Sequence, residues 1–101
     1  MKHFSSALAA LFLVSAGAAQ AADLTAIRSA IQNGDCNQAV TALNSAISAG
    51  DADAMNQLAS MHLVGTCVAH DQAQAIALYE KAAAAGSSRA KAMLERARKN
   101  G

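Results

Sequence analysis

The chain has 101 residues and a formal net charge of +1; 53% of its residues are apolar and 15% are charged. A chain of this length forms one domain at most, and this charge balance carries no basic surplus that would indicate binding to nucleic acid. Small domains bury little apolar surface, so additional stabilisation is expected, and two cysteines are available for it.

The N-terminal segment has the pattern of a secretory signal peptide. Lys2 and His3 form a positive start, an apolar stretch follows at 4–14, and Ala19-Gln20-Ala21 supplies an A-x-A ending. We expect cleavage after Ala21, which leaves 22–101 as the mature chain. The apolar stretch is shorter than the roughly 20 residues that span a bilayer, so no stable membrane insertion is expected after cleavage. The predicted location is periplasmic or secreted.

The remainder of the chain is predicted to be all-helical. It contains no proline that would interrupt a helix. Asp35, Asp71 and Ser87 stand where N-caps belong, and Gly50 and Gly86 follow helical segments as stops. Five helices are expected, at about 23–32, 36–48, 52–64, 72–85 and 88–99.

The chain also matches itself at an offset of 36 residues. This periodicity indicates a helical repeat, in which each unit buries its apolar face against the next. The capping aspartates and the stop glycines are the informative matches, because alanine is common throughout. The matching pairs are Asp35 with Asp71, Gln38 with Gln74, Ala39 with Ala75, Ala46 with Ala82, Ala49 with Ala85, Gly50 with Gly86, Ala54 with Ala90 and Leu58 with Leu94.

Apolar side chains follow the same helices. Leu24, Ile27 and Ile31 share a face of the first helix, and the third helix takes its apolar bulk from a group near its end. That group is Leu58, Met61, Leu63 and Val64.

The segment 51–86 resembles a Sel1-like repeat, a relative of the tetratricopeptide repeat. The resemblance rests on Ala52-Asp53-Ala54, Gln57-Leu58, Met61-His62-Leu63, Gly65-Thr66-Cys67-Val68, Asp71, Ala75, Leu78-Tyr79, Lys81-Ala82-Ala83 and Gly86. Cys67 departs from the pattern by replacing the second glycine of the usual turn, and Leu78 stands where an aromatic residue is common. Residues 22–50 look like a degenerate preceding repeat, and 87–101 look like a capping helix.

The resemblance to a small exported bacterial member of this family implies a fold and a function. The fold is a short right-handed α-solenoid of stacked antiparallel helix pairs with a concave face. The function is that of an adaptor module without catalytic residues or cofactors, which binds an unidentified protein or peptide on that face. An inhibitor or immunity protein that neutralises a periplasmic toxin or enzyme is the alternative that the resemblance also permits.

The candidate contacts with a partner are the polar and charged positions on the first helix of each repeat. They are Arg28, Gln32, Asn56, Gln57, Ser60 and Arg89. In the family's pattern the position of Tyr79 belongs to the core, so we expect it there with its phenol edge reaching solvent. A binding anchor is the alternative for this residue, because it is the only aromatic residue in 22–101.

The two cysteines are predicted to form a disulfide. An even number of cysteines in an exported chain favours one, and stacking of successive repeats would bring the regions of Cys36 and Cys67 to the same edge. The alternative is a metal or small-ligand site formed by Cys36, Cys67, His62 and His70, since Cys67 and His70 have the spacing of a zinc turn. His62 is otherwise expected at a packing edge.

No pattern in the sequence indicates catalysis. Phosphate-binding glycine loops and a G-x-S-x-G nucleophile turn are absent, and helix capping accounts for most of the aspartates. We therefore expect no enzyme activity.

Overall fold

The computed structural model describes residues 23–100, and it confirms the all-helical prediction. Each helix begins and ends within one residue of its expected boundary. The predicted signal peptide, 1–21, lies outside the described residues. The helices are α2 (Leu24–Gln32), α3 (Cys36–Ser48), α4 (Ala52–Val64), α5 (Gln72–Ala84) and α6 (Ser88–Lys99).

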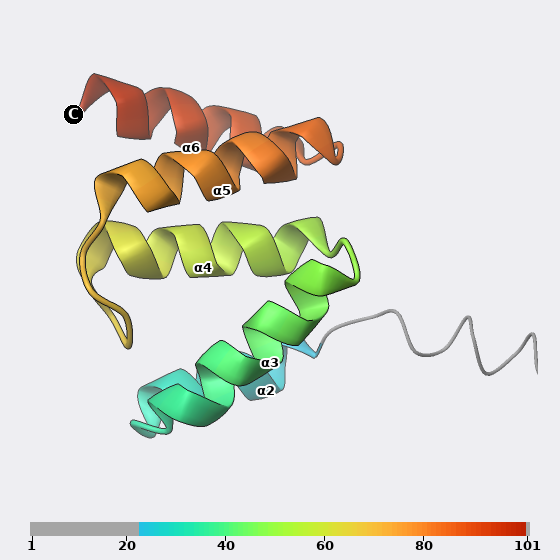
Figure 1. The fold of residues 1–101 in the computed structure, drawn as a ribbon, viewed down its shortest axis with the longest axis vertical. Helices are drawn as coiled ribbons and strands as arrows, with labels where there is room; N and C mark the ends of the chain where they lie inside the picture. The colour runs from blue at the N-terminus through green and yellow to red at the C-terminus, as the bar shows by residue number, and fades with distance from the viewer. Residues whose placement is uncertain (1–22, 101) are drawn as a thin grey trace, which may run out of the picture.

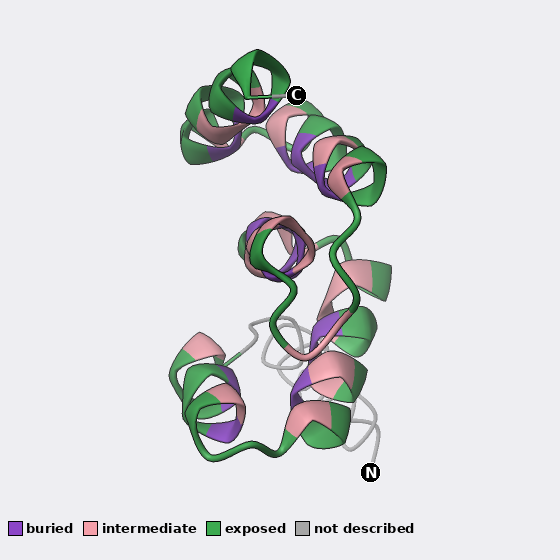
Figure 2. Cartoon of the chain, turned by 90° about the vertical axis from the view of Figure 1, so that its left-hand side faces the viewer, coloured by how far each residue is buried: buried purple, intermediate pink, exposed green. Residues whose placement is uncertain are grey.

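The helices stack in chain order, and each packs against the next along the chain (Figure 1). Helices α4, α5 and α6 lie side by side, whereas α2 and α3 form a separate pair that meets α4 at an angle. In Figure 2, α2, α4 and α6 lie toward the left side of the stack, and α3 and α5 lie toward the right side. This is the arrangement of a short helical repeat solenoid, in which the first helices of successive repeats share a face.

Side-chain caps begin four of the five helices within 23–100. Asp71 accepts a hydrogen bond from the backbone N–H of Gln74 at 3.0 Å, and Ser87 accepts one from Ala90 at 3.1 Å, as predicted. Asp35 also occupies its predicted N-cap position, at the start of α3, but its carboxylate accepts no capping hydrogen bond. The matching aspartates of the two repeats therefore differ in function.

The predicted glycine stops are confirmed. Gly50 and Gly86 have φ values of +89° and +102°, which a residue without Cβ adopts at little cost. After each of them the backbone turns back, so that the N–H groups of Asp51 and Ser87 donate to Ala46 and Ala82 at 3.0 Å. These bonds satisfy carbonyl groups that would otherwise be left unpaired at the helix ends.

The core consists largely of alanine, and a few larger side chains complete it. Leu43 and Tyr79 are the largest fully buried residues among those described. The phenol edge predicted to reach solvent does not, because Tyr79 is 0% exposed and its hydroxyl lies 2.9 Å from Ser60 Oγ. The prediction for Val64 is wrong: Val64 is the last residue of α4 and is 74% exposed, whereas Leu58 and Met61 of the same helix are buried. The alanines with no exposed surface are Ala39, Ala54, Ala59, Ala75, Ala82 and Ala90.

Polar contacts join α4, α5 and α6 to one another. Ser60 of α4 pairs with Tyr79 of α5, and the side chain of Gln72 at the start of α5 donates to the Ala97 carbonyl in α6 at 2.8 Å. In the turn between α4 and α5, the His62 carbonyl accepts from the Asp71 N–H at 2.9 Å. These contacts fix the three helices as one layered unit.

Candidate functional site

The first helices of the repeats enclose a pocket with a volume of about 250 Å³. Each helix contributes residues spaced three or four positions apart, which places them on one face. Helix α2 provides Leu24 and Arg28, and α6 provides Arg89 and Met93. Helix α4 provides Asp53, Asn56, Gln57 and Ser60, with Tyr79 of α5 behind them.

Asn56 is the only polar residue in the part of the chain described here that is classed as buried, with 8% of its surface exposed. Its Nδ2 donates a hydrogen bond to Ser87 Oγ at 3.0 Å, and the same oxygen accepts the capping bond from Ala90. The Asn56 side chain is thereby held between α4 and the start of α6. Its Oδ1 is buried and receives no hydrogen bond from any group of the described chain.

Ser60 and Tyr79 are paired with each other in the lining of the pocket. The hydrogen bond between their oxygens satisfies a phenol that would otherwise be buried without a partner. Ser60 lies one turn beyond Asn56 on α4, and its hydrogen bond to Tyr79 holds it against α5.

The charged groups of the pocket are two arginines and one carboxylate, those of Arg28, Arg89 and Asp53. Within residues 23–100 a single salt bridge is present, between Arg98 and Glu80 at 2.7 Å. Arg28 and Arg89 are therefore not paired with a carboxylate in this part of the structure, and the lining carries a net positive charge.

Five of the six residues that the sequence suggested as partner contacts line this one pocket, namely Arg28, Asn56, Gln57, Ser60 and Arg89. Gln32 does not: it is exposed at the end of α2, away from the lining residues. Binding of a partner by these residues stays a prediction, since their placement alone does not test it.

The sequence reasoning missed Leu24, Asp53 and Met93 as lining residues. A signal for Asp53 was present, because it lies three and four positions before Asn56 and Gln57 and so shares their helix face. Leu24 and Met93 were indistinguishable from core residues, since both are half-buried apolar side chains.

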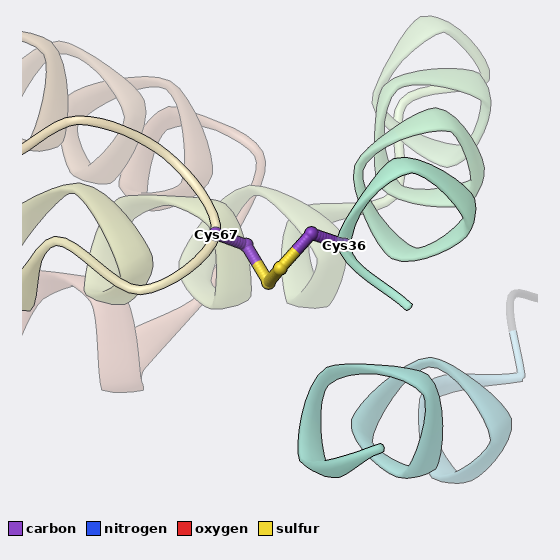
Figure 3. The surroundings of a disulfide bond; sticks show 2 residues. All are labelled: Cys36 and Cys67. Atoms are coloured by element: carbon purple, nitrogen blue, oxygen red, sulfur yellow. A yellow bond between two sulfur atoms is a disulfide. The ribbon is translucent and has the colours of Figure 1, made fainter. Parts of the chain in front are cut away.

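The predicted disulfide between Cys36 and Cys67 is present, with the two Cα atoms 5.1 Å apart (Figure 3). It joins the first residue of α3 to the turn between α4 and α5, and so links the two helix pairs. The alternative metal site loses its thiol ligands in this state, because both sulfurs belong to the disulfide. Among residues 23–100, no group of three potential metal-ligating side chains comes together.

His62 lies at a packing edge, as expected. Its Nδ1 is 3.2 Å from the carbonyl of Ala69, and since a carbonyl only accepts, Nδ1 carries the proton. The ring therefore braces the turn between α4 and α5 in addition to the backbone bond to Asp71.

Residues 52–87 match the family model of the Sel1 repeat. The match covers α4, α5 and the turn that follows them, which is the segment that carries the resemblance in sequence. Neither a curated protein nor a solved structure matched the chain. The Sel1 repeat is typical of protein–protein interaction modules without enzyme activity, and it suggests a protein as the partner.

None of the helices in the described range is both long enough and apolar enough to cross a membrane.

Proposed function

We propose that the protein is an exported interaction module that binds a protein or peptide on the concave face formed by α2, α4 and α6. The observation that carries this proposal is the pocket on that face. Its lining combines unpaired arginines with amide and hydroxyl groups from three successive first helices. Stacked helical repeats typically use such a shared face to bind their partners.

Export is part of the proposal and has its own support. Disulfides persist in oxidising compartments, and the Cys36–Cys67 bond joins two parts of the fold that share no side-chain hydrogen bond within 23–100. Expression of the full chain in a bacterial host, followed by intact-mass analysis of the periplasmic fraction, tests this. We expect a species that begins at Ala22 and has lost two protons to the disulfide; a cytoplasmic, unprocessed chain would contradict export.

The binding function is tested by capture of a partner from periplasmic extract with the oxidised, processed protein. Gln57→Ala alters the concave face, whereas Gln38→Ala removes the same side chain from an exposed position on α3. We expect a stoichiometric protein whose recovery falls with Gln57→Ala and is unchanged with Gln38→Ala. Equal recovery by both variants would place the binding surface elsewhere, and the partner's own activity distinguishes an adaptor from an inhibitor.

A further inference from the structure

The pocket on the concave face pairs an apolar side chain with a cationic one on each of its outer helices. On α2, Leu24 lies one turn before Arg28, and on α6, Arg89 lies one turn before Met93. Residues four positions apart are neighbours on the surface of a helix. Each of these helices therefore presents to the pocket a half-buried apolar side chain beside a guanidinium group.

This combination limits the chemistry of a group that fills the pocket. An aliphatic side chain would pack against Leu24 and Met93, but it would cover charged groups without satisfying them. A carboxylate would bring a charge against the same apolar side chains, and Asp53 already places one in the lining. An aromatic ring suits both kinds of neighbour, because it is apolar and its π face attracts a guanidinium group. The thioether of Met93 also favours contact with a ring.

The size of the pocket agrees with a single aromatic side chain. Its volume is about 250 Å³. An apolar cavity of about 150 Å³ holds a benzene ring, whereas pockets that enclose a whole small molecule measure roughly 300–1,000 Å³. The pocket thus accommodates one ring that projects from a larger partner.

The protein has no ring of its own to place there. Tyr79 is the only aromatic residue in 22–101, and it is 0% exposed behind Ser60. A ring in contact with Leu24 and Met93 has to come from another molecule.

We propose that this pocket binds one aromatic side chain of the partner protein. The ring packs against Leu24 and Met93 and turns its π face to the guanidinium group of Arg28 or Arg89. The amide of Gln57, in the same lining, can bond an indole N–H or a phenol O–H, which favours tryptophan and tyrosine over phenylalanine. This inference rests on the proposed function, and it specifies the residue type by which the partner is held.

Neutral amino-acid amides test the pocket without any partner. The probes are the N-acetyl amides of tryptophan, phenylalanine, cyclohexylalanine and leucine, and the oxidised, processed protein carries ¹³C-methyl methionine. We expect both aromatic probes to shift the Met93 methyl signal in a saturable way. Met55 and Met61 are buried outside the pocket, so their signals should stay unchanged.

Phenylalanine and cyclohexylalanine form a matched pair, because both carry a six-membered ring and only one has a π face. We expect the phenylalanine probe to bind about fivefold more tightly than the cyclohexylalanine probe. The leucine probe should bind no better than the cyclohexylalanine probe.

Variants of the protein test the arginines. Arg28→Gln and Arg89→Gln are each expected to weaken the tryptophan probe by about threefold and to narrow the difference between phenylalanine and cyclohexylalanine. Arg96→Gln removes the same charge from an exposed position two turns further along α6, outside the lining, and should change neither value. Circular dichroism checks that the variants are folded.

The captured partner tests whether the pocket is used. Exposed aromatic residues of the partner are replaced by alanine one at a time, and one replacement is expected to weaken binding by about thirtyfold, as for an aromatic residue that fills a pocket. That loss should become smaller when it is measured with Arg28→Gln or Arg89→Gln, since these changes remove part of the same contact.

The possible failures are distinguishable. Equal binding of the phenylalanine and cyclohexylalanine probes, or no saturable shift of Met93 with either aromatic probe, overturns the aromatic proposal and leaves the interaction module intact. A partner that tolerates replacement of every exposed aromatic residue has the same meaning. Binding of the aromatic probes at Met93, together with no captured protein partner, would instead overturn the proposed function.

Discussion

The two halves of the molecule are held together in different ways. Helices α4, α5 and α6 bury most of the core and are joined by the Asn56–Ser87, Ser60–Tyr79 and Gln72–Ala97 hydrogen bonds. Helices α2 and α3 bury two residues each, and within 23–100 no side-chain hydrogen bond links them to the rest. The Cys36–Cys67 bond adds a covalent cross-link between the two halves, besides the backbone that leads from α3 to α4.

This difference shows how a helix pair with few contacts of its own can be held in the fold. A repeat that makes few specific contacts of its own contributes less to the free energy of folding, and a disulfide offsets this by reducing the entropy of the unfolded chain. The pocket takes its lining from both halves, because Arg28 lies on α2 while Arg89 lies on α6. The disulfide therefore supports the shape of the pocket as well as the stability of the fold.

The largest expected effect comes from removing this bond. The Cys36→Ser/Cys67→Ser variant opens a loop whose ends are separated by 31 residues, which in the chain-entropy model costs about 3–4 kcal/mol. Hydrogen exchange should show loss of protection in α2 and α3 first, with α4–α6 retained. Dithiothreitol provides the control, since it should loosen the unaltered protein and leave the variant unchanged. Uniform loss of protection across all five helices would contradict the division into two halves.

The capping aspartates give a smaller and more local comparison. Asp71→Ala removes a hydrogen bond to the Gln74 N–H and should lower the free energy of unfolding by about 1 kcal/mol. Asp35→Ala removes no such bond and should cost less than half as much. Urea denaturation of the two variants measures both values, and equal losses would mean that Asp35 does cap α3 in solution.

The Ser60–Tyr79 pair tests the connection between α4 and α5. Tyr79→Phe keeps the buried ring but leaves Ser60 without its partner, so we expect a loss of about 0.5–1.5 kcal/mol. The double variant with Ser60→Ala should cost less than the sum of the two single changes, because both remove the same bond. Strict additivity in thermal melts would show that the two hydroxyls do not interact.

The smallest effect is expected at the Arg98–Glu80 salt bridge between α6 and α5. Both side chains are more than half exposed, at 55% and 52%, so solvent screens their interaction. Glu80→Gln should change the free energy of unfolding by less than about 0.5 kcal/mol, and salt should reduce even that. A loss well above this value would mean that α6 depends on the ion pair and not on its packing.

The helix boundaries could be predicted because they are set locally. Glycines with positive φ end helices at Gly50 and Gly86, and Asp71 and Ser87 begin them through bonds to residues three positions ahead. Asp35 shows the limit of this reasoning, since it occupies the predicted N-cap position but makes no capping bond, unlike Asp71.

The candidate site was harder to predict because it depends on contacts between distant residues. The polar character of Asn56 suggested an exposed contact, yet Asn56 is buried against Ser87, 31 positions away. Gln32 followed the same reasoning as Arg28 and shares its face of α2, but it is the last residue of the helix and does not line the pocket. Helix periodicity predicts which residues share a face of one helix. It does not predict against which face the next helix packs.

Side-chain NMR of the oxidised protein during titration with the partner captured from periplasmic extract tests the central claim most directly. The account predicts that the side-chain amide of Asn56 and the Nε–H groups of Arg28 and Arg89 shift together, while Arg96 and the exposed faces of α3 and α5 do not. Shifts confined to α3 and α5, with the signals of Asn56 and both arginines unchanged, would contradict it.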